Sequence, residues 1–178
     1  MAVGGTEQAR TRVIVHPNRD TPAAKATRLA IFALLLASIG LFAIVTIGGW
    51  SELQGAQGVT IGYIAVYALI AVMVLRWRRG VLPVAAALAV LIAVVAAIAG
   101  PAWYERDRSG FAPSDLPPDV LGTLTLAIVP VQLLLIAFAL RGFAQKWNVE
   151  VELDEEEARR YHRGDWRGPA RFATGTER

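Results

Sequence analysis

The sequence contains no cysteine, and only two of its 178 residues are histidines. Without thiols the chain has no disulfide, no thiolate metal site and no thiol nucleophile. His16 and His162 both lie near the chain ends, so no imidazole is placed to ligate a haem inside a membrane. The sequence therefore predicts no cofactor and no metal-binding residue.

Charge is also absent from four long stretches of the chain. Residues 29–50, 53–75, 81–104 and 120–140 contain no Asp, Glu, Lys, Arg or His. Crossing the hydrocarbon core takes roughly 20 helical residues, and these runs show none of the polar periodicity of a soluble helix. The sequence predicts an all-α integral membrane protein, a four-transmembrane-helix bundle with short loops. Because polar residues dilute the start of the second run, its expected span is 57–75.

Several kinds of chemistry have no counterpart in this sequence. Ionisable residues inside spans mark proton relays and ion paths, and their absence argues against a proton-coupled transporter. The chain has no phosphate-binding loop, no dinucleotide fingerprint and no G-x-S-x-G setting for a serine nucleophile. We therefore expect no catalytic residue, no enzyme activity and no small-molecule substrate. The basic residues are too sparse to predict nucleic-acid binding.

The basic residues predict an orientation in the membrane. If the four runs all span, 16 of the 18 Lys and Arg residues fall on one side, and only Arg106 and Arg108 fall on the other. Lys and Arg accumulate on the cytoplasmic side, so both termini are expected there. The Ala, Val and Arg bias is typical of a high-GC bacterium, which makes the cytoplasmic (inner) membrane the expected location.

Two terminal segments flank the expected membrane domain of residues 29–140. Residues 1–28 are interpreted as a mostly disordered cytoplasmic tail. Residues 141–178 form a second cytoplasmic tail, with a short helix expected at 154–163 because acidic residues precede basic ones there. The end of the chain, 164–178, is expected to be disordered.

Small and aromatic residues indicate how the helices meet. The third run carries a stripe of alanines at every fourth position, which predicts close helix packing. Gly58 and Gly62 form one G-x-x-x-G in the second run. The alanine stripe consists of Ala85, Ala89, Ala93 and Ala97.

The tryptophans give a separate indication. Trp50, Trp77, Trp103 and Trp147 fall at or near the ends of runs, which is typical of aromatic residues at the membrane interface.

Three polar side chains fall near the middle of the runs: Ser38, Tyr67 and Gln132. Each is expected to find a partner rather than face lipid. We expect them to meet near Pro130, which predicts a kink in the fourth span. Two interpretations of these residues remain open: interhelical hydrogen bonding, or a polar spot in a ligand cavity.

The segment 101–119 is the longest polar interruption between two runs. It is interpreted as a connector anchored at the interface, with a partner-docking loop and a metal or catalytic site as the alternatives. Asp119 is expected to cap the fourth span. The acidic residues available on this side are Glu52, Glu105, Asp107, Asp115 and Asp119.

The function that this pattern favours is a small multi-pass protein that acts as an accessory or assembly subunit of a membrane complex. Its expected partners are the lipid bilayer and either another membrane protein or further copies of itself. One alternative is a component of an oligomeric transporter or channel. A second alternative is an enzyme that acts on lipid at the interface.

Overall fold

The computed structural model describes residues 12–53, 55–106 and 114–166. The chain divides into two compact units. The first is a helical bundle within Asn18–Asn148. The second is formed by the described parts of the two chain ends, Met1–Pro17 and Val149–Arg178.

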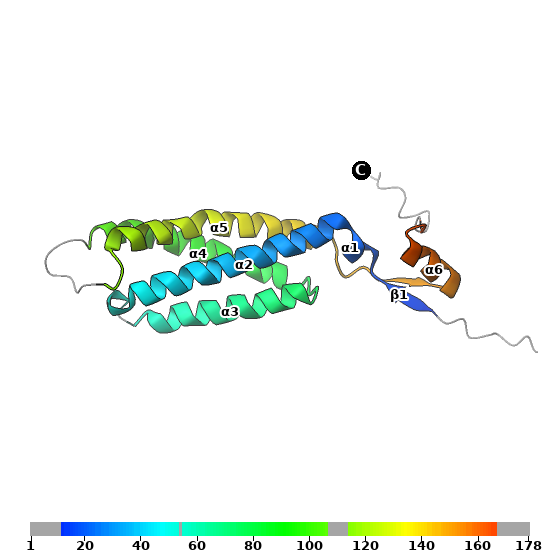
Figure 1. Ribbon diagram of the computed structural model, residues 1–178, viewed down its shortest axis with the longest axis horizontal. Coiled ribbons are helices and arrows are strands. Elements are labelled where there is room, and N and C mark those ends of the chain that lie inside the picture. The colour runs from blue at the N-terminus through cyan, green and yellow to red at the C-terminus, as the bar shows by residue number, and fades with distance from the viewer. Residues whose placement is uncertain (1–11, 54, 107–113, 167–178) are drawn as a thin grey trace, which may run out of the picture. The chain divides into compact units, whose positions relative to one another are not determined.

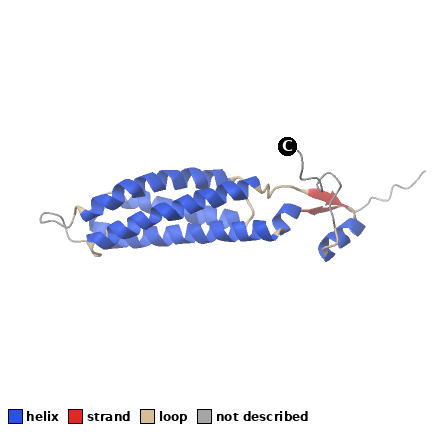
Figure 2. Ribbon diagram, turned by 90° about the horizontal axis from the view of Figure 1, so that it is seen from above, coloured by secondary structure: helices blue, strands red, loops and turns tan. Residues whose placement is uncertain are grey.

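The bundle unit consists of four long helices that run up and down beside one another (Figures 1 and 2). Each of the four is long and apolar enough to cross a membrane. A short helix, α1, precedes them, and a 3₁₀ turn, η1, follows the first of them. The elements are α1 (Pro17–Asp20), α2 (Pro22–Gly48), η1 (Trp50–Glu52), α3 (Gln57–Leu75), α4 (Val81–Tyr104) and α5 (Pro118–Ala144).

The helix bounds follow the charge-free runs at α3 and α4 but extend beyond them at α2 and α5. Helix α2 begins at Pro22, seven residues before the first run, because the Thr21 hydroxyl accepts a hydrogen bond from Ala24 N at 3.2 Å and Pro22 suits the first turn. Helix α5 begins at Pro118 after Pro117, so Asp119 lies inside the first turn and makes no side-chain cap. The expectation that Asp119 caps this helix is therefore wrong.

Both ends of the bundle unit lie at one end of the bundle, which we call the tail end. Asn18 Nδ2 donates to the carbonyls of Gln145 and Lys146, each at 3.1 Å, and Arg19 Nε donates to Trp147 O at 2.7 Å. These contacts join the entry into α2 to the exit from α5. The opposite end, which carries η1 and the end of α4 at Tyr104, is called the loop end.

Two arginines donate hydrogen bonds to carbonyls at the C-terminal ends of helices at the tail end. Arg28 Nη1 donates to Leu75 O, the last carbonyl of α3, at 3.3 Å, and its guanidinium lies 4.2 Å from the centre of the Trp77 ring. Arg79 Nε donates to Phe143 O near the end of α5 at 2.8 Å. The last carbonyls of a helix lack partners within the helix, and a cation there also suits the helix dipole.

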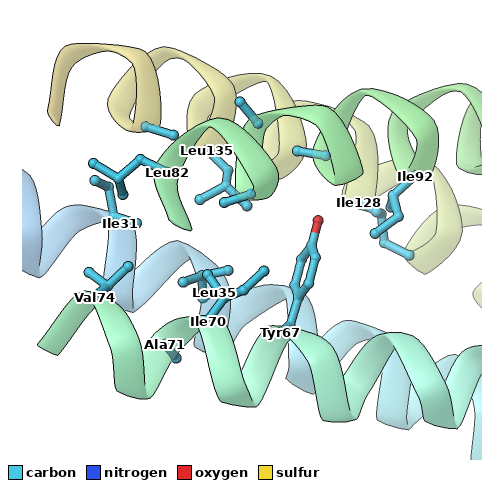
Figure 3. Packing of buried hydrophobic residues seen from close by; sticks show 14 of the residues in the cluster. Ile31, Leu35, Tyr67, Ile70, Ala71, Val74, Leu82, Ile92, Ile128 and Leu135 are labelled. Carbon is cyan, nitrogen blue, oxygen red and sulfur yellow. The ribbon is translucent and has the colours of Figure 1, made fainter. Parts of the chain in front are cut away.

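The core runs the length of the bundle, with side chains from all four helices (Figure 3). Helix α4 packs most extensively on α5, α2 packs on both α5 and α3, and α3 meets α4 only sparsely. In α4 the buried positions include Ala85 and Ala89 but continue through Ile92 and Ala96, whereas Ala97 is exposed. The expected alanine stripe is therefore wrong in its second half, because an exact four-residue repeat drifts around a helix of 3.6 residues per turn.

Aromatic residues at the helix ends do not all face outward. Trp50 is 48% exposed, but Trp103 is 5% exposed and Trp147 is fully buried. The direction in which each ring points does not follow from its position at or near a helix end. Trp103 and Trp147 instead fill the interior at the two ends of the bundle.

The second unit is a small sheet and helix built from both chain ends. Strand β1 (Val13–Val15) pairs antiparallel with β2 (Val151–Leu153), with Ile14 opposite Glu152. Helix α6 (Glu155–Arg163) follows Asp154, whose carboxylate accepts from Glu157 N at 2.8 Å. The buried side chains are Val15, Leu153 and Ala158, with Trp166 packed against them.

This second unit differs from the interpretation of two separate tails. Residues 1–28 were expected to be mostly disordered, yet β1, α1 and the start of α2 lie within them. Trp166 lies within the segment expected to be disordered and packs on the small core. Residues 1–11 and 167–178 lie outside the described residues. Short strands at the two ends of a chain pair only when the chain ends meet, and a local pattern does not predict this.

Candidate functional site

The three polar residues near the middle of the spans form one hydrogen-bonded chain. Tyr67 Oη donates to Gln132 Oε1 at 2.8 Å, and Gln132 Nε2 donates to Ser38 Oγ at 2.9 Å. Ser38 Oγ in turn donates to Leu34 O, one turn earlier in α2, at 2.8 Å. All three side chains are fully buried, and Figure 3 shows the Tyr67 ring pointing from α3 into the bundle. The expectation that these residues meet is confirmed.

This polar chain connects three helices, because Ser38 lies on α2, Tyr67 on α3 and Gln132 on α5. Each hydroxyl donates once, and each of the two amide atoms of Gln132 has a partner. A polar group in an apolar interior is costly unless it is paired. The arrangement therefore fixes the register of α2, α3 and α5, and the geometry favours interhelical hydrogen bonding over a ligand cavity at this level.

A second polar feature lies at the loop end. Glu52, at the end of η1, has a side chain only 6% exposed, and Arg106 Nη1 lies 3.4 Å from its Oε2. The same guanidinium nitrogen lies 3.4 Å from Glu52 O, and the Arg106 guanidinium is 4.7 Å from the centre of the Trp103 ring. The pair joins the α2–α3 connection to the end of α4.

A pocket of about 360 Å³ lies beside this ion pair. Its walls are almost entirely apolar and come from all four long helices. Glu52 and Arg106 are the charged residues in its lining. The wall residues include Phe42 of α2, Val59 and Tyr63 of α3, Val95 and Ala99 of α4, and Ile128 of α5.

The carboxylate of Glu52 is only partly satisfied. Its Oε1 is buried and has no hydrogen-bond partner among the described residues, whereas Oε2 faces Arg106. An unpaired buried oxygen of a carboxylate is costly. Thr46 Oγ1, near the end of α2, is likewise buried and without a partner among the described residues.

The outward face of α3 carries a third feature. Gly58, Gly62, Ala65, Leu69 and Val72 follow one another at spacings of four and three residues, and all are exposed. A Cβ placed on Gly58 or Gly62 would meet nothing within 4 Å. The G-x-x-x-G of the sequence therefore takes no part in packing among the described residues of this chain.

The acidic residues on the loop side do not converge. Glu105 and Asp115 are exposed, Asp119 is exposed in the first turn of α5, and only Glu52 is buried. Asp107 lies outside the described residues. Over residues 12–53, 55–106 and 114–166, no group of three His, Asp or Glu side chains is placed to hold a metal ion.

Sequence reasoning named Glu52 as one of several acidic residues but missed its partner and the pocket. Glu52 and Arg106 are 54 positions apart, so no local pattern connects them. One signal was available, because Glu52 is the only charged residue between Leu29 and Leu75. A lone charge between two apolar runs has little water around it and favours a partner.

Comparison with family models, with curated proteins and with solved structures finds no match to this chain. The class of protein therefore follows from the helices of the fold alone. Four helices long and apolar enough to span a bilayer make it a multi-pass membrane protein.

Proposed function

We propose that this protein is a non-catalytic membrane subunit that works through contact with another membrane protein. The observation that carries the proposal is the outward face of α3, formed by Gly58, Gly62, Ala65, Leu69 and Val72. The small residues are at the end of α3 nearest η1, and the larger ones follow toward the tail end.

The two glycines on the outward face of α3 require an explanation, because glycine destabilises a helix. Glycine in a helix interior costs roughly 1 kcal/mol of stability relative to alanine. Within the part of the chain that the structure describes, Gly58 and Gly62 provide no close packing that would offset this cost. Small residues four apart let a second helix approach closely, and this close packing drives association within a bilayer. The four-and-three spacing of the five residues also matches the seam of two helices that cross at a shallow angle.

Helix α3 is also the helix best placed to present such a face. It is the shortest of the four, with 19 residues, and packs mainly on α2. Much of its circumference is therefore free of contacts with α4 and α5. A helix of a partner protein is the occupant we propose for this face, and a second copy of this chain is the alternative that the experiment separates.

We predict that Gly62→Leu lowers recovery of the partner at least about tenfold, equivalent to ~1.4 kcal/mol. The leucine side chain would occupy the space through which the partner backbone approaches. The measurement is affinity purification in a mild detergent followed by intact-mass analysis of the complex.

Gly40→Leu is the matched control. Gly40 is an exposed glycine in the middle of α2, and a Cβ there also meets nothing within 4 Å. This variant should keep the partner and the stability of the wild type. Equal recovery with Gly62→Leu, or purification of the wild type as a lone monomer, would contradict the proposal. A complex containing only this chain would assign the α3 face to self-association.

We also propose that the protein lies in the cytoplasmic membrane with both termini in the cytoplasm. The support is the distribution of Lys and Arg, 16 of 18 on the side of the two termini. Reporter fusions after Arg79 and after Lys146 are expected to read as cytoplasmic, and a fusion after Glu105 as exported. An exported signal after Lys146 would contradict this orientation.

A further inference from the structure

We infer that the pocket at the loop end binds an amphiphile whose chain lies along the apolar walls and whose polar end donates a hydrogen bond to Glu52. The ligand class is a membrane lipid with an N–H or O–H donor in its headgroup. This site is separate from the α3 face proposed for the partner, since its α3 lining comprises Val59, Thr60 and Tyr63 rather than Gly58 and Gly62.

The size and lining of the pocket fit the apolar part of such a ligand. A volume of about 360 Å³ falls within the range of small-molecule pockets, which are mostly apolar with a few placed polar groups. Phe42, Tyr63 and Ile128 line it from three different helices. The pocket is therefore an indentation of the bundle rather than a groove on one helix.

The pocket is accessible from the surface that faces lipid. Val59 of α3 and Val95 of α4 both line it, and they are 62% and 63% exposed. These residues stand on the two helices that meet only sparsely. A chain can thus enter sideways between α3 and α4 without crossing water.

The polar end of the ligand is assigned from the carboxylate. An ionised carboxylate accepts hydrogen bonds and donates none. Arg106 faces Oε2 of Glu52, and Oε1 is buried without a partner among the described residues. A ligand donor would satisfy this oxygen, whereas a headgroup that only accepts would leave it unpaired. Arg106, whose side chain is 32% exposed, can in addition contact a lipid phosphate.

The experiment uses the full chain in phosphatidylcholine vesicles that contain one photoactivatable lipid with a diazirine in its acyl chain. Three probes differ only in the headgroup: ethanolamine donates from an ammonium, glycerol donates from hydroxyls, and choline has no N–H or O–H donor. We expect at least one donor probe to label peptides of α3 and α4 around Val59 and Val95 several-fold more than the choline probe. Preference for ethanolamine assigns the ammonium, and preference for glycerol assigns the hydroxyl.

Two variants separate the headgroup site from the chain site. Glu52→Leu removes the acceptor and should bring the ratio of donor to choline labelling to about one. Ala99→Phe places a ring in the pocket and should reduce labelling by all probes several-fold, whereas Ala97→Phe, on the exposed side of α4, should not. If Glu52→Leu fails to fold, the Ala99→Phe and Ala97→Phe pair still tests the site.

Two results would overturn the inference. The first is equal labelling by donor and choline probes in the wild type. The second is pocket labelling that is no greater than labelling of the lipid-facing side of α2 around Leu36, which is exposed and lies outside the pocket lining.

Discussion

Replacing Trp147 with alanine is expected to lower the free energy of unfolding by about 3–5 kcal/mol. Trp147 is fully buried at the tail end and stacks edge-on against Trp77, with ring centroids 5.2 Å apart. Its indole N–H donates to Gln145 Oε1 at 2.9 Å. Removing the ring leaves a cavity beside Gly142 and an unpaired amide oxygen. The measurement is unfolding in mixed micelles with increasing fractions of a denaturing detergent.

Trp50→Ala provides the matched control for this prediction. Trp50 is 48% exposed at the other end of the bundle, so its removal should change the unfolding free energy by less than about 1 kcal/mol. A loss for Trp147→Ala no larger than that for Trp50→Ala would show that the buried ring does not hold the tail end together.

Gly122→Leu is the second substitution with a large expected effect, a loss of about 3 kcal/mol. A Cβ at residue 122 would lie 2.8 Å from the Tyr104 ring and 3.1 Å from the backbone oxygen of Gly100. The Tyr104 ring is partly exposed and can move, but the Gly100 carbonyl belongs to the backbone of α4. Helices α4 and α5 would have to separate at this contact to admit the leucine side chain.

The same measurement applied to Gly40→Leu tests whether glycine replacement itself is costly. Gly40 has open space where a Cβ would be, and we expect no loss there. If Gly122→Leu and Gly40→Leu retain equal stability, the close approach of α4 and α5 does not contribute to the fold.

The hydrogen-bonded chain of Ser38, Gln132 and Tyr67 shows how much of the structure residue type alone can predict. Ser38, Tyr67 and Gln132 were the polar residues near the middle of three different runs, and an apolar environment drives such groups together. Their meeting was therefore predictable. Which atom donates to which was not, because it depends on the rotation of α2, α3 and α5 about their own axes.

The alanine positions of α4 show where such reasoning fails. Each of Ala85, Ala89, Ala93 and Ala97 is suited to close packing, but only the first two belong to the buried face. The neighbours decide this, because α5 covers a stripe that follows the true helical period. The same holds for Trp103 and Trp147, whose position at or near the end of a charge-free run was evident from the sequence, whereas their burial was not.

The sequence by itself determined that the chain has four apolar helices long enough to span a bilayer. This property depends on local composition, because length and hydropathy decide one segment at a time whether a helix can span a bilayer. Only the tertiary structure decided that Glu52 pairs with Arg106 beside a pocket, that the α3 glycines face outward and that the two chain ends form a common sheet. The ion pair and the sheet bring together residues that are distant in sequence, and the direction of the glycines depends on which side of α3 is covered by other helices. The composition of a single segment contains no information on either.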